Sequence, residues 1–314
     1  MNSQAVSASE KFEPRLVPRV SELVSGRIRH GVLGATLTTF AIGGPLAALI
    51  TVESTEELSA VLQALAAEGQ QVRTLGFGSN CLIDDRGLDH WVVRLGAGFK
   101  GLTIRDDGLV QAGASASLMS VARKLSDEGF SGLEFAAGIP ASLGGAVFMN
   151  AGAHGSELCD RVVSVQGVSP SGGFVTWPRD ELPWRYRSSG LPRQAIVTGV
   201  TLQLEPGDKA RISQVCSENL AERRARQPLA LASAGSVFKN PSPDSPAGRL
   251  LEAAGLKGVR VGGAVVSERH ANWIVNPERS ATAVDVLGLM ELCQRRVRES
   301  CGVELEPEVR LWRS

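Results

Sequence analysis

The segment 138–155 restricts the fold most strongly, because it places five glycines and one proline among small apolar residues. Its sequence is Gly-Ile-Pro-Ala-Ser-Leu-Gly-Gly-Ala-Val-Phe-Met-Asn-Ala-Gly-Ala-His-Gly. Glycine permits positive φ and lets the main chain approach a ligand without a Cβ in the way. Successive exposed backbone N–H groups form a concave site for phosphate oxygens. The segment predicts a backbone site for a nucleotide diphosphate, and the alternative is a buried tight turn between packed elements.

A second glycine motif, Leu75-Gly-Phe-Gly-Ser-Asn80, follows a strand-like run at residues 71–75. Two glycine-rich loops that could each bind phosphate indicate that the ligand is a dinucleotide. The motif begins like a Rossmann fingerprint, but Cys81 occupies the position of the third glycine. The continuation to Arg94 is a poor helix, because an Asp-Asp-Arg-Gly turn interrupts it before another β-rich run. A Rossmann fold is therefore excluded.

Composition limits the class of protein. With 314 residues and 43% hydrophobic residues, the chain can bury the cores of two or three units. Lys plus Arg and Asp plus Glu both number 33, so no overall field favours nucleic acid or an anionic membrane. The five cysteines are widely spaced without a Cys-x-x-Cys pair, which argues against a disulfide framework and a metal site.

Residues 1–20 hold no apolar signal-peptide core, and no later run approaches the ~20 apolar residues that span a bilayer. We therefore expect a soluble, cytoplasmic protein without a nucleic-acid or membrane partner, and no obligate protein partner is evident.

Apolar spacing predicts helices at 54–69, 118–129 and 282–300, and we also expect helices over the charged stretch 211–226 and over 245–255. The first begins with a capping box, Ser54-Thr-Glu-Glu57, and the fourth has Ser245 and Pro246 as N-cap and first helical residue. The final run 303–311 alternates apolar and charged residues, which is typical of a strand. Composition changes after Gly207, where we expect a new domain.

Eight motifs in register resemble those of the UDP-N-acetylenolpyruvoylglucosamine reductase family of flavoenzymes, over about Thr36 to Trp312. They are Thr39-Phe40 with Gly43-Gly44-Pro45, Leu75–Asn80, Gly138–Gly145, Asn150-Ala-Gly152, Tyr186-Arg-Ser188, Gly235–Pro241, His270-Ala-Asn272 and Glu306-Pro-Glu308. No long insertion follows Arg187, so the chain resembles the shorter, type II subclass.

The resemblance implies an α+β protein whose FAD-binding fold is of the p-cresol methylhydroxylase and vanillyl-alcohol oxidase type. A smaller α+β substrate-binding domain follows it. We expect two FAD-binding subdomains over 36–206, the substrate domain over 207–314, and an N-terminal extension of unknown role over 1–35.

The resemblance also implies noncovalent FAD, with NADPH as cosubstrate. The substrate would be UDP-N-acetylglucosamine enolpyruvate, reduced to UDP-N-acetylmuramate for peptidoglycan synthesis. His154 is then a loop residue rather than a covalent flavin anchor. The candidate cofactor-binding residues are Gly76, Phe77, Gly78, Ser79, Asn80, Gly138, Ile139, Pro140, Ser142, Gly144, Gly145, Asn150 and Gly152.

Three residues are candidate catalytic groups by the same resemblance. A hydride would pass from FAD N5 to C3 of the substrate, Ser236 would protonate C2, and Arg187 with Glu308 would stabilise the enolate. By residue type alone, Arg187 is a solvated charge, Ser236 a turn residue, and Glu308 part of an exposed acidic face. Burial beside the substrate carboxylate would raise the pKa of Glu308.

The candidate substrate-binding residues are Tyr186, Arg226, Lys239, Asn240 and Trp273. Trp273 stands where shorter members usually have phenylalanine, and packing in the core is the alternative to covering the substrate. Two other functions remain open: an oxidase or dehydrogenase of the same fold acting on a sugar or hydroxy acid, and a non-catalytic nucleotide-binding protein.

Overall fold

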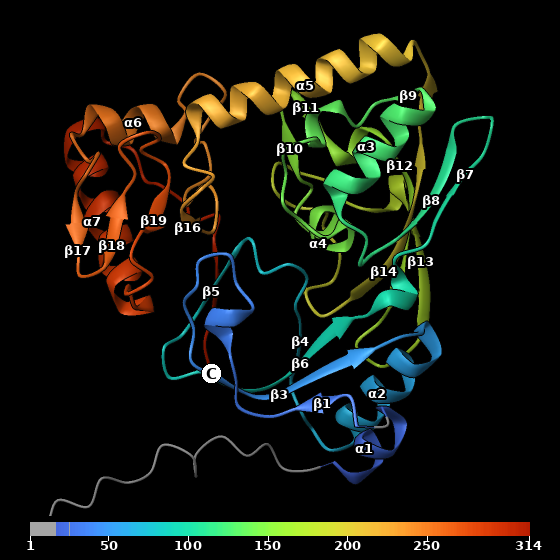
Figure 1. Cartoon of the computed structure of the whole chain (residues 1–314). Helices are drawn as coiled ribbons and strands as arrows, with labels where there is room; N and C mark the ends of the chain where they lie inside the picture. Colours follow the sequence, from blue (N-terminus) through green and yellow to red (C-terminus); the bar gives the residue numbers. More distant parts are fainter. Residues whose placement is uncertain (1–16, 25) are drawn as a thin grey trace, which may run out of the picture.

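The computed structural model describes residues 17–24 and 26–314, which form three parts, each built on its own sheet (Figure 1). The other residues of the predicted N-terminal extension, 1–16 and 25, lie outside the described part. Within the described ranges, no helix is both long and apolar enough to cross a bilayer.

The first part is a mixed sheet in the order β1-β3-β6-β4, with β2 also paired to β3. The strands are β1 (Ile28–Arg29), β2 (Val32–Leu33), β3 (Pro45–Val52), β4 (Val72–Thr74) and β6 (Leu88–Leu95). Helices α1 (Pro18–Val24) and α2 (Thr55–Ala67) lie below it in Figure 1 and share its core. Residues 17–24 and 26–35, which the sequence assigned to an extension, thus contribute a helix and two strands to this part.

Helix α2 forms where the apolar spacing predicted it. Its stripe of Leu58, Val61, Leu62 and Leu65 is buried, and each such side chain stabilises the fold by about 1.5–3 kcal/mol. Only half of the predicted capping box forms: Ser54 Oγ accepts a hydrogen bond from the backbone N of Glu57 at 3.1 Å. The Glu57 carboxylate instead accepts from the backbone N of Glu53 at 2.6 Å and pairs with Arg27, which draws it away from Ser54.

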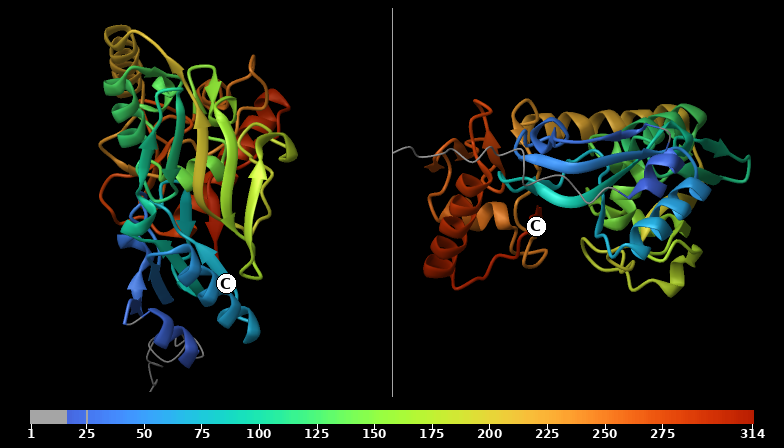
Figure 2. Two further views of the ribbon diagram at one scale, coloured as in Figure 1. Left: turned by 90° about the vertical axis from the view of Figure 1, so that its right-hand side faces the viewer. Right: turned by 90° about the horizontal axis from the view of Figure 1, so that it is seen from below.

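The second part is an antiparallel sheet in the order β13-β12-β14-β8-β7, whose strands run side by side in the left view of Figure 2. The strands are β7 (Leu102–Ile104), β8 (Leu109–Gly113), β12 (Val162–Val168), β13 (Phe174–Pro178) and β14 (Ile196–Gln203). Helices α3 (Leu118–Glu128) and α4 (Leu143–Phe148) share one apolar core with it. Helix α3 ends as predicted at Gly129, whose φ of 84° suits glycine.

Helix α5 (Lys209–Arg226) runs across the top of Figure 1 from the second part to the third. It packs on α3 and on η3 (Glu134–Ala136). The remaining short elements are strand pairs β9 (Phe130–Ser131) with β15 (Glu205–Pro206) and β10 (Gly152–Ala153) with β11 (Ser156–Glu157), and the 3-10 turns η1 (Gly34–Thr36), η2 (Ala97–Phe99), η4 (Leu158–Asp160) and η5 (Arg179–Glu181).

The third part is the sheet β16-β19-β18-β17, covered by α6 (Ala247–Ala253) and α7 (Ala283–Cys301). Its strands are β16 (Ala232–Ser233), β17 (Arg260–Val261), β18 (Ala264–Val266) and β19 (Ile274–Asn276). The predicted buried face of α7 is confirmed, and Gly302 caps it with a φ of 68°. Helix α6 begins one residue later than predicted, because Pro246 is the N-cap and Asn240 Oδ1 accepts from the backbone N of Ala247 at 3.0 Å.

The last residues return to the first part, where β20 (Arg310–Trp312) pairs in parallel with β5 (Cys81–Ile83). The chain end lies beside the first sheet in Figure 1. The alternating run 303–311 was predicted as one strand, but only a bridge between Phe238 and Pro307 and the start of β20 are hydrogen-bonded as strand. The predicted alternation of burial holds only in part: Leu305 and Val309 are buried, but Val303 and Leu311 are half-buried, and Glu308, which was expected on the charged face, is largely buried as well. Here the chain crosses between two sheets, so neither sheet pairs with its full length.

Side chains join the first and third parts across this crossing. Asp85 accepts hydrogen bonds from the backbone N of Ala283 at 2.8 Å and of Val284 at 3.2 Å, so it caps α7 from the first part. Asn276 Nδ2 donates to the carbonyl of Phe40 at 3.1 Å. These bonds fix the third part against the first.

Replacing Asp85 by alanine removes the acceptors of the Ala283 and Val284 backbone N–H groups, whereas the Thr282 cap of α7 remains. Loss of a helix cap destabilises a protein by about 0.5–2 kcal/mol, and we expect a loss in this range in urea unfolding. Asp106→Ala at an exposed position is the control. Equal stability of the two variants would show that the contact between Asp85 and α7 contributes nothing.

Candidate active site

The two glycine motifs lie against each other. A Cβ on Gly76 would stand 2.2 Å from Ser142 Oγ, so the first motif touches the start of α4 in the second. Ser142 is the N-cap of α4 and accepts a hydrogen bond from the backbone N of Gly145 at 3.3 Å. The loops predicted to hold one dinucleotide are therefore brought together from two sheets.

Packing within the protein already requires several of these glycines. A Cβ on Gly78 would lie 2.2 Å from the carbonyl oxygen of Leu37, and its φ is 66°. A Cβ on Gly144 would lie 2.8 Å from the Cβ of Ala114. The sequence attributed both glycines to the approach of a ligand, but close contact between protein segments is sufficient to explain them. Phe77, Pro140 and Gly145 are exposed beside them, whereas Ser79 and Ile139 are half-buried.

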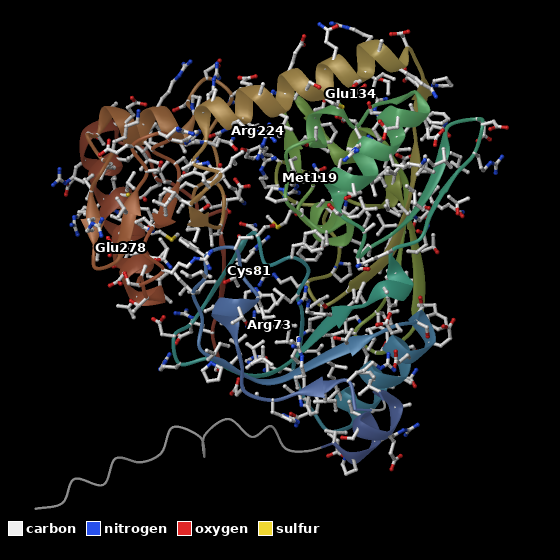
Figure 3. The ribbon with its side chains drawn as sticks, viewed as in Figure 1. Arg73, Cys81, Met119, Glu134, Arg224 and Glu278 are labelled. Carbon is white, nitrogen blue, oxygen red and sulfur yellow. The ribbon has the colours of Figure 1, made fainter. Side chains whose placement is uncertain are left out.

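Asn80, a predicted cofactor residue, also holds the C-terminal segment. Its Nδ2 donates to the carbonyl of Glu308 at 3.2 Å, and its own carbonyl accepts from the backbone N of Arg310 at 3.0 Å. The register of β5 and β20 places Arg310 opposite Cys81, labelled in Figure 3. The first glycine motif is thus joined directly to the residue predicted to be a catalytic acid.

Asn150, also predicted to bind cofactor, is fully buried and bonded to protein groups. Its Nδ2 donates to Glu157 at 2.8 Å and to the carbonyl of Arg185 at 3.1 Å, and its Oδ1 accepts from the backbone N of Cys159 at 3.0 Å. These bonds anchor the loop that carries Arg187.

Arg187 stands at the tip of a tight turn. Arg185 and Ser188 exchange backbone hydrogen bonds of 2.8 and 2.9 Å, and Arg187 itself has a φ of 58°. Positive φ is unfavourable for a residue with a Cβ and is found where the surroundings enforce it, often at functional sites. The turn therefore fixes the direction of the Arg187 side chain.

The Arg187 guanidinium binds the Glu308 carboxylate. Nε donates to Oε1 at 2.8 Å, and the two side chains are only 19% and 15% exposed. Arg187 also donates to the carbonyl of Gly152 at 3.2 Å and has Glu157 at 3.9 Å. Its guanidinium carbon lies 4.6 Å from the centre of the Tyr186 ring, within cation–π range.

Ser236 lies close to this pair through the backbone. The carbonyl of Val237 accepts a hydrogen bond from the backbone N of Glu308 at 2.8 Å, and Lys239 N donates to the carbonyl of Glu306 at 2.9 Å. The structure thus brings the segments of all three predicted catalytic residues together from residues far apart in the sequence.

Burial distinguishes Glu308 from the other acids of the run. Desolvation by burial raises the pKa of Glu308, and the charge and hydrogen bond of Arg187 oppose that rise. Lys239 and Arg310 oppose it too. Glu304 and Glu306 stay exposed and pair with Arg298 at 2.8 Å and Lys239 at 2.5 Å. The expected rise in the pKa of Glu308 is confirmed in direction.

Among the predicted substrate residues, Tyr186 is 41% exposed and Lys239 approaches Glu308 as described. Asn240 caps α6. Arg226 is 75% exposed and pairs with Glu222 at 2.9 Å, so it faces solvent. Trp273 is 6% exposed, which favours core packing, the alternative that the sequence left open.

Sequence reasoning overlooked Glu157 and Arg223. Glu157 bonds Asn150 and lies near Arg187, whereas Arg223 lies over Gly138 with its Nε buried. Neither belongs to one of the eight family motifs, and one charged residue among 33 acids or 33 bases carries no signal of its own.

These features fit an anionic dinucleotide. Two glycine loops from separate sheets touch, and the buried Nε of Arg223 lacks a hydrogen-bond partner among the described residues. Arg187 of the second part and Glu308, on the segment that returns from the third part, form an arginine–carboxylate pair. The fold and site together define an FAD-dependent oxidoreductase with a separate substrate-binding domain.

Comparison with known proteins identifies the family. The FAD binding domain model matches residues 45–177, and the model of the UDP-N-acetylenolpyruvoylglucosamine reductase C-terminal domain matches residues 227–312. The reductase of Heliobacterium modesticaldum is 44% identical over 276 residues, covering 87% of each chain. A Symbiobacterium thermophilum reductase is 42% identical over 91% of this chain and 92% of its own. The crystal structure of the Thermus caldophilus reductase has a TM-score of 0.78 at 39% identity, covering 91% of this chain and all of the other.

The chain belongs to the UDP-N-acetylenolpyruvoylglucosamine reductase family. It is thus a UDP-N-acetylmuramate dehydrogenase of peptidoglycan precursor synthesis, with an FAD-binding domain and NADPH as reductant. The predicted fold class and family are confirmed, and the length of the chain agrees with the shorter type.

Replacing Glu308 by glutamine should change how stability depends on pH. Because burial raises the pKa of Glu308 above its ordinary 4.5, the folded state keeps that proton to higher pH than the unfolded chain does. Its contribution to the free energy of unfolding is thus full below pH 4.5 and is lost as pH rises through the raised pKa. Glu308→Gln should flatten this decline in urea unfolding. The control is Glu306→Gln, whose side chain is 70% exposed, and identical profiles for both variants would contradict the assignment.

Proposed function

We propose that Arg187, Ser236 and Glu308 are the catalytic residues for reduction of UDP-N-acetylglucosamine enolpyruvate to UDP-N-acetylmuramate. The observation that supports this most is the buried contact of 2.8 Å between Arg187 and Glu308. Glu308 is in turn bonded to the residue after Ser236. Three groups that could hold a carboxylate, stabilise an enolate and deliver a proton therefore lie in one place.

FAD, when bound, supplies transfer of a hydride from NADPH to C3 of the enolpyruvyl group. The residues that would hold it are those of the two touching loops, from Gly76 to Asn80 and from Gly138 to Gly145. Backbone N–H groups of these loops would bind its phosphates, and the cofactor would be held noncovalently.

Arg187 binds the enolpyruvyl carboxylate. A planar guanidinium offers parallel N–H donors that match a carboxylate or an enolate in a way that lysine does not. The tight turn from Arg185 to Ser188 and the bonds to Glu308 and Gly152 hold it in one direction. Negative charge that develops on the substrate therefore meets a donor already in place.

Glu308 would orient the enol form of the substrate or exchange a proton with it. Burial raises the pKa of Glu308, so this carboxyl group takes up a proton more readily than the exposed acids of the same run. The charges of Arg187 and Lys239 lower the pKa of Glu308 and so oppose the effect of burial, which keeps the carboxyl group able to release a proton. The balance of burial and charge makes Glu308 a proton-exchanging partner of Arg187.

Ser236 donates the proton to C2. A serine hydroxyl is a weak acid and needs ordered geometry and nearby positive charge to act. The bond from Glu308 N to the carbonyl of Val237 orders the neighbouring backbone. Lys239, three residues further on, supplies positive charge on the same loop.

The proposal extends to the rest of the substrate and to the division of the chain. Lys239 and Asn240 would contact the pyrophosphate and sugar, Asn240 with the side chain that caps α6. Tyr186, beside Arg187, would line the same site. The solvent-facing Arg226 and the core-packed Trp273 do not fit the predicted contact with substrate. Residues 36–206 would bind FAD, and residues 207–314 would bind the substrate. All five cysteines are free thiols, which suits the reducing cytoplasm.

A two-step anaerobic experiment tests this function. NADPH should bleach the flavin absorbance of the purified protein, and UDP-N-acetylglucosamine enolpyruvate should restore it. Acid precipitation should release the flavin into the supernatant. Reoxidation by oxygen alone would favour an oxidase, and bound flavin that NADPH does not bleach would favour a non-catalytic binding protein.

Replacing Ser236 by alanine should separate the two half-reactions, because the serine is assigned only to proton donation. NADPH should bleach the flavin at close to the wild-type rate. Reoxidation by the enolpyruvyl substrate should slow by about 10²–10⁴-fold in stopped-flow measurements. Ser242→Ala at an exposed position is the control. Equal slowing of both half-reactions would make Ser236 a binding or structural residue.

Replacing Glu306 and Glu308 one at a time by glutamine tests which of the two carboxylates takes part in the reaction. Glu308→Gln should slow reoxidation by the substrate strongly, and Glu306→Gln should not, because only Glu308 contacts Arg187. Glutamine keeps the size of the side chain and removes its charge. Arg187→Lys should change the rate in the same direction as Glu308→Gln, since a point charge cannot make two parallel contacts. A larger defect in Glu306→Gln would overturn the assignment.

A further inference from the structure

Arg223 is a half-buried cation that the proposed mechanism does not use. It lies near the C-terminal end of α5, and its Nε is fully buried without a hydrogen-bond partner among residues 17–24 and 26–314. Desolvation lowers the pKa of Arg223, and the charge of Arg187 lowers it further. No acidic side chain offsets these effects.

Its side chain lies directly over the second glycine loop. A Cβ on Gly138 would stand 2.6 Å from Cδ and 2.7 Å from Nε of Arg223. The stem also packs beside Leu220, since the same Cβ would lie 3.4 Å from a methyl group of that residue. Arg223 thus lies against one of the two loops predicted to hold phosphate.

The neighbouring charges are already paired. Arg187 binds Glu308, and Glu222 lies between Arg226 at 2.9 Å and His154 at 3.5 Å. Gln227, one helical turn after Arg223, also has a buried Oε1 without a partner in the described part of the chain. A neutral amide oxygen does not balance a buried charge, because an unpaired ion keeps its full desolvation penalty.

We propose that Arg223 binds an anionic group, a phosphate or a carboxylate, of a ligand seated against Gly138. This rests on the proposed function, which offers two sources of such a group: the pyrophosphate of FAD, and the pyrophosphate or carboxylate of the enolpyruvyl UDP-sugar. A guanidinium makes charge-assisted, two-pronged bonds to either group. The desolvation penalty of Arg223 is then offset when the ligand binds.

Replacing Arg223 by methionine tests the proposal through binding rather than turnover. Methionine fills a similar volume without charge, so the flavin-free full chain should unfold at the same temperature as wild type or higher. The affinity for at least one anionic ligand should fall at least about tenfold, as expected for a lost hydrogen bond to a charged group. The probes are FAD, UDP and UDP-N-acetylglucosamine enolpyruvate, and riboflavin is the phosphate-free control.

The matched control variant is Arg224→Met, on the same helix with an exposed side chain (Figure 3). Weaker binding of FAD but not riboflavin assigns the cofactor pyrophosphate as the partner. Weaker binding of UDP assigns the substrate pyrophosphate, and weaker binding of the enolpyruvyl compound alone assigns its carboxylate. Because equilibrium binding needs no turnover, these results remain readable even if the proposed reaction fails.

Two results would overturn the proposal. One is affinity for all three anionic ligands equal to that of Arg224→Met. The other is unfolding of the flavin-free chain in both Arg223→Met and Arg223→Lys, which would make the arginine a structural residue. Arg223→Lys keeps the charge and loses the planar fork, so its affinity should fall between wild type and Arg223→Met.

Discussion

The contact between Arg187 and Glu308 depends on the arrangement of the whole chain. Its arginine stands on a turn of the second part, and its glutamate on the segment that returns from the third part to the first. Neither side chain could be buried alone, because an isolated ion in a site of low polarity is strongly destabilising. The contact therefore forms only when all three parts are folded and packed together.

The backbone of the C-terminal segment makes this arrangement specific. The carbonyl of Val237 accepts a hydrogen bond from the backbone N of Glu308, and the Asn80 side chain donates to the carbonyl of Glu308. The carbonyl of Asn80 also accepts from the backbone N of Arg310, the first residue of β20. A shift by one residue would exchange buried and exposed side chains and would bring Pro307 or Val309, neither of which carries a charge, to Arg187. The same Asn80 ends the first glycine motif, so the loop that would hold FAD also positions Glu308.

Charge in the site is unevenly balanced. Arg187 is surrounded by Glu308, Glu157 and the carbonyl of Gly152, whereas Arg223 on α5 has no acidic neighbour of this kind. Excess positive charge beside two glycine loops favours anionic ligands, although the chain as a whole has a net charge of zero. Local placement, rather than composition, thus gives the site its preference.

The sequence alone determined the family, the class of fold and the long helices. Apolar spacing and capping residues act over a few residues, so α2, α3, α5 and α7 could be predicted with their ends nearly correct. The family motif selected Glu308 from three similar acids. The structure gives the physical difference, because only Glu308 of the three is buried enough for its pKa to be raised. Only the tertiary structure decided the roles of Asn80, Asn240, Trp273 and Arg223, because each depends on contacts between residues distant along the chain. A pattern read along one segment does not contain those contacts.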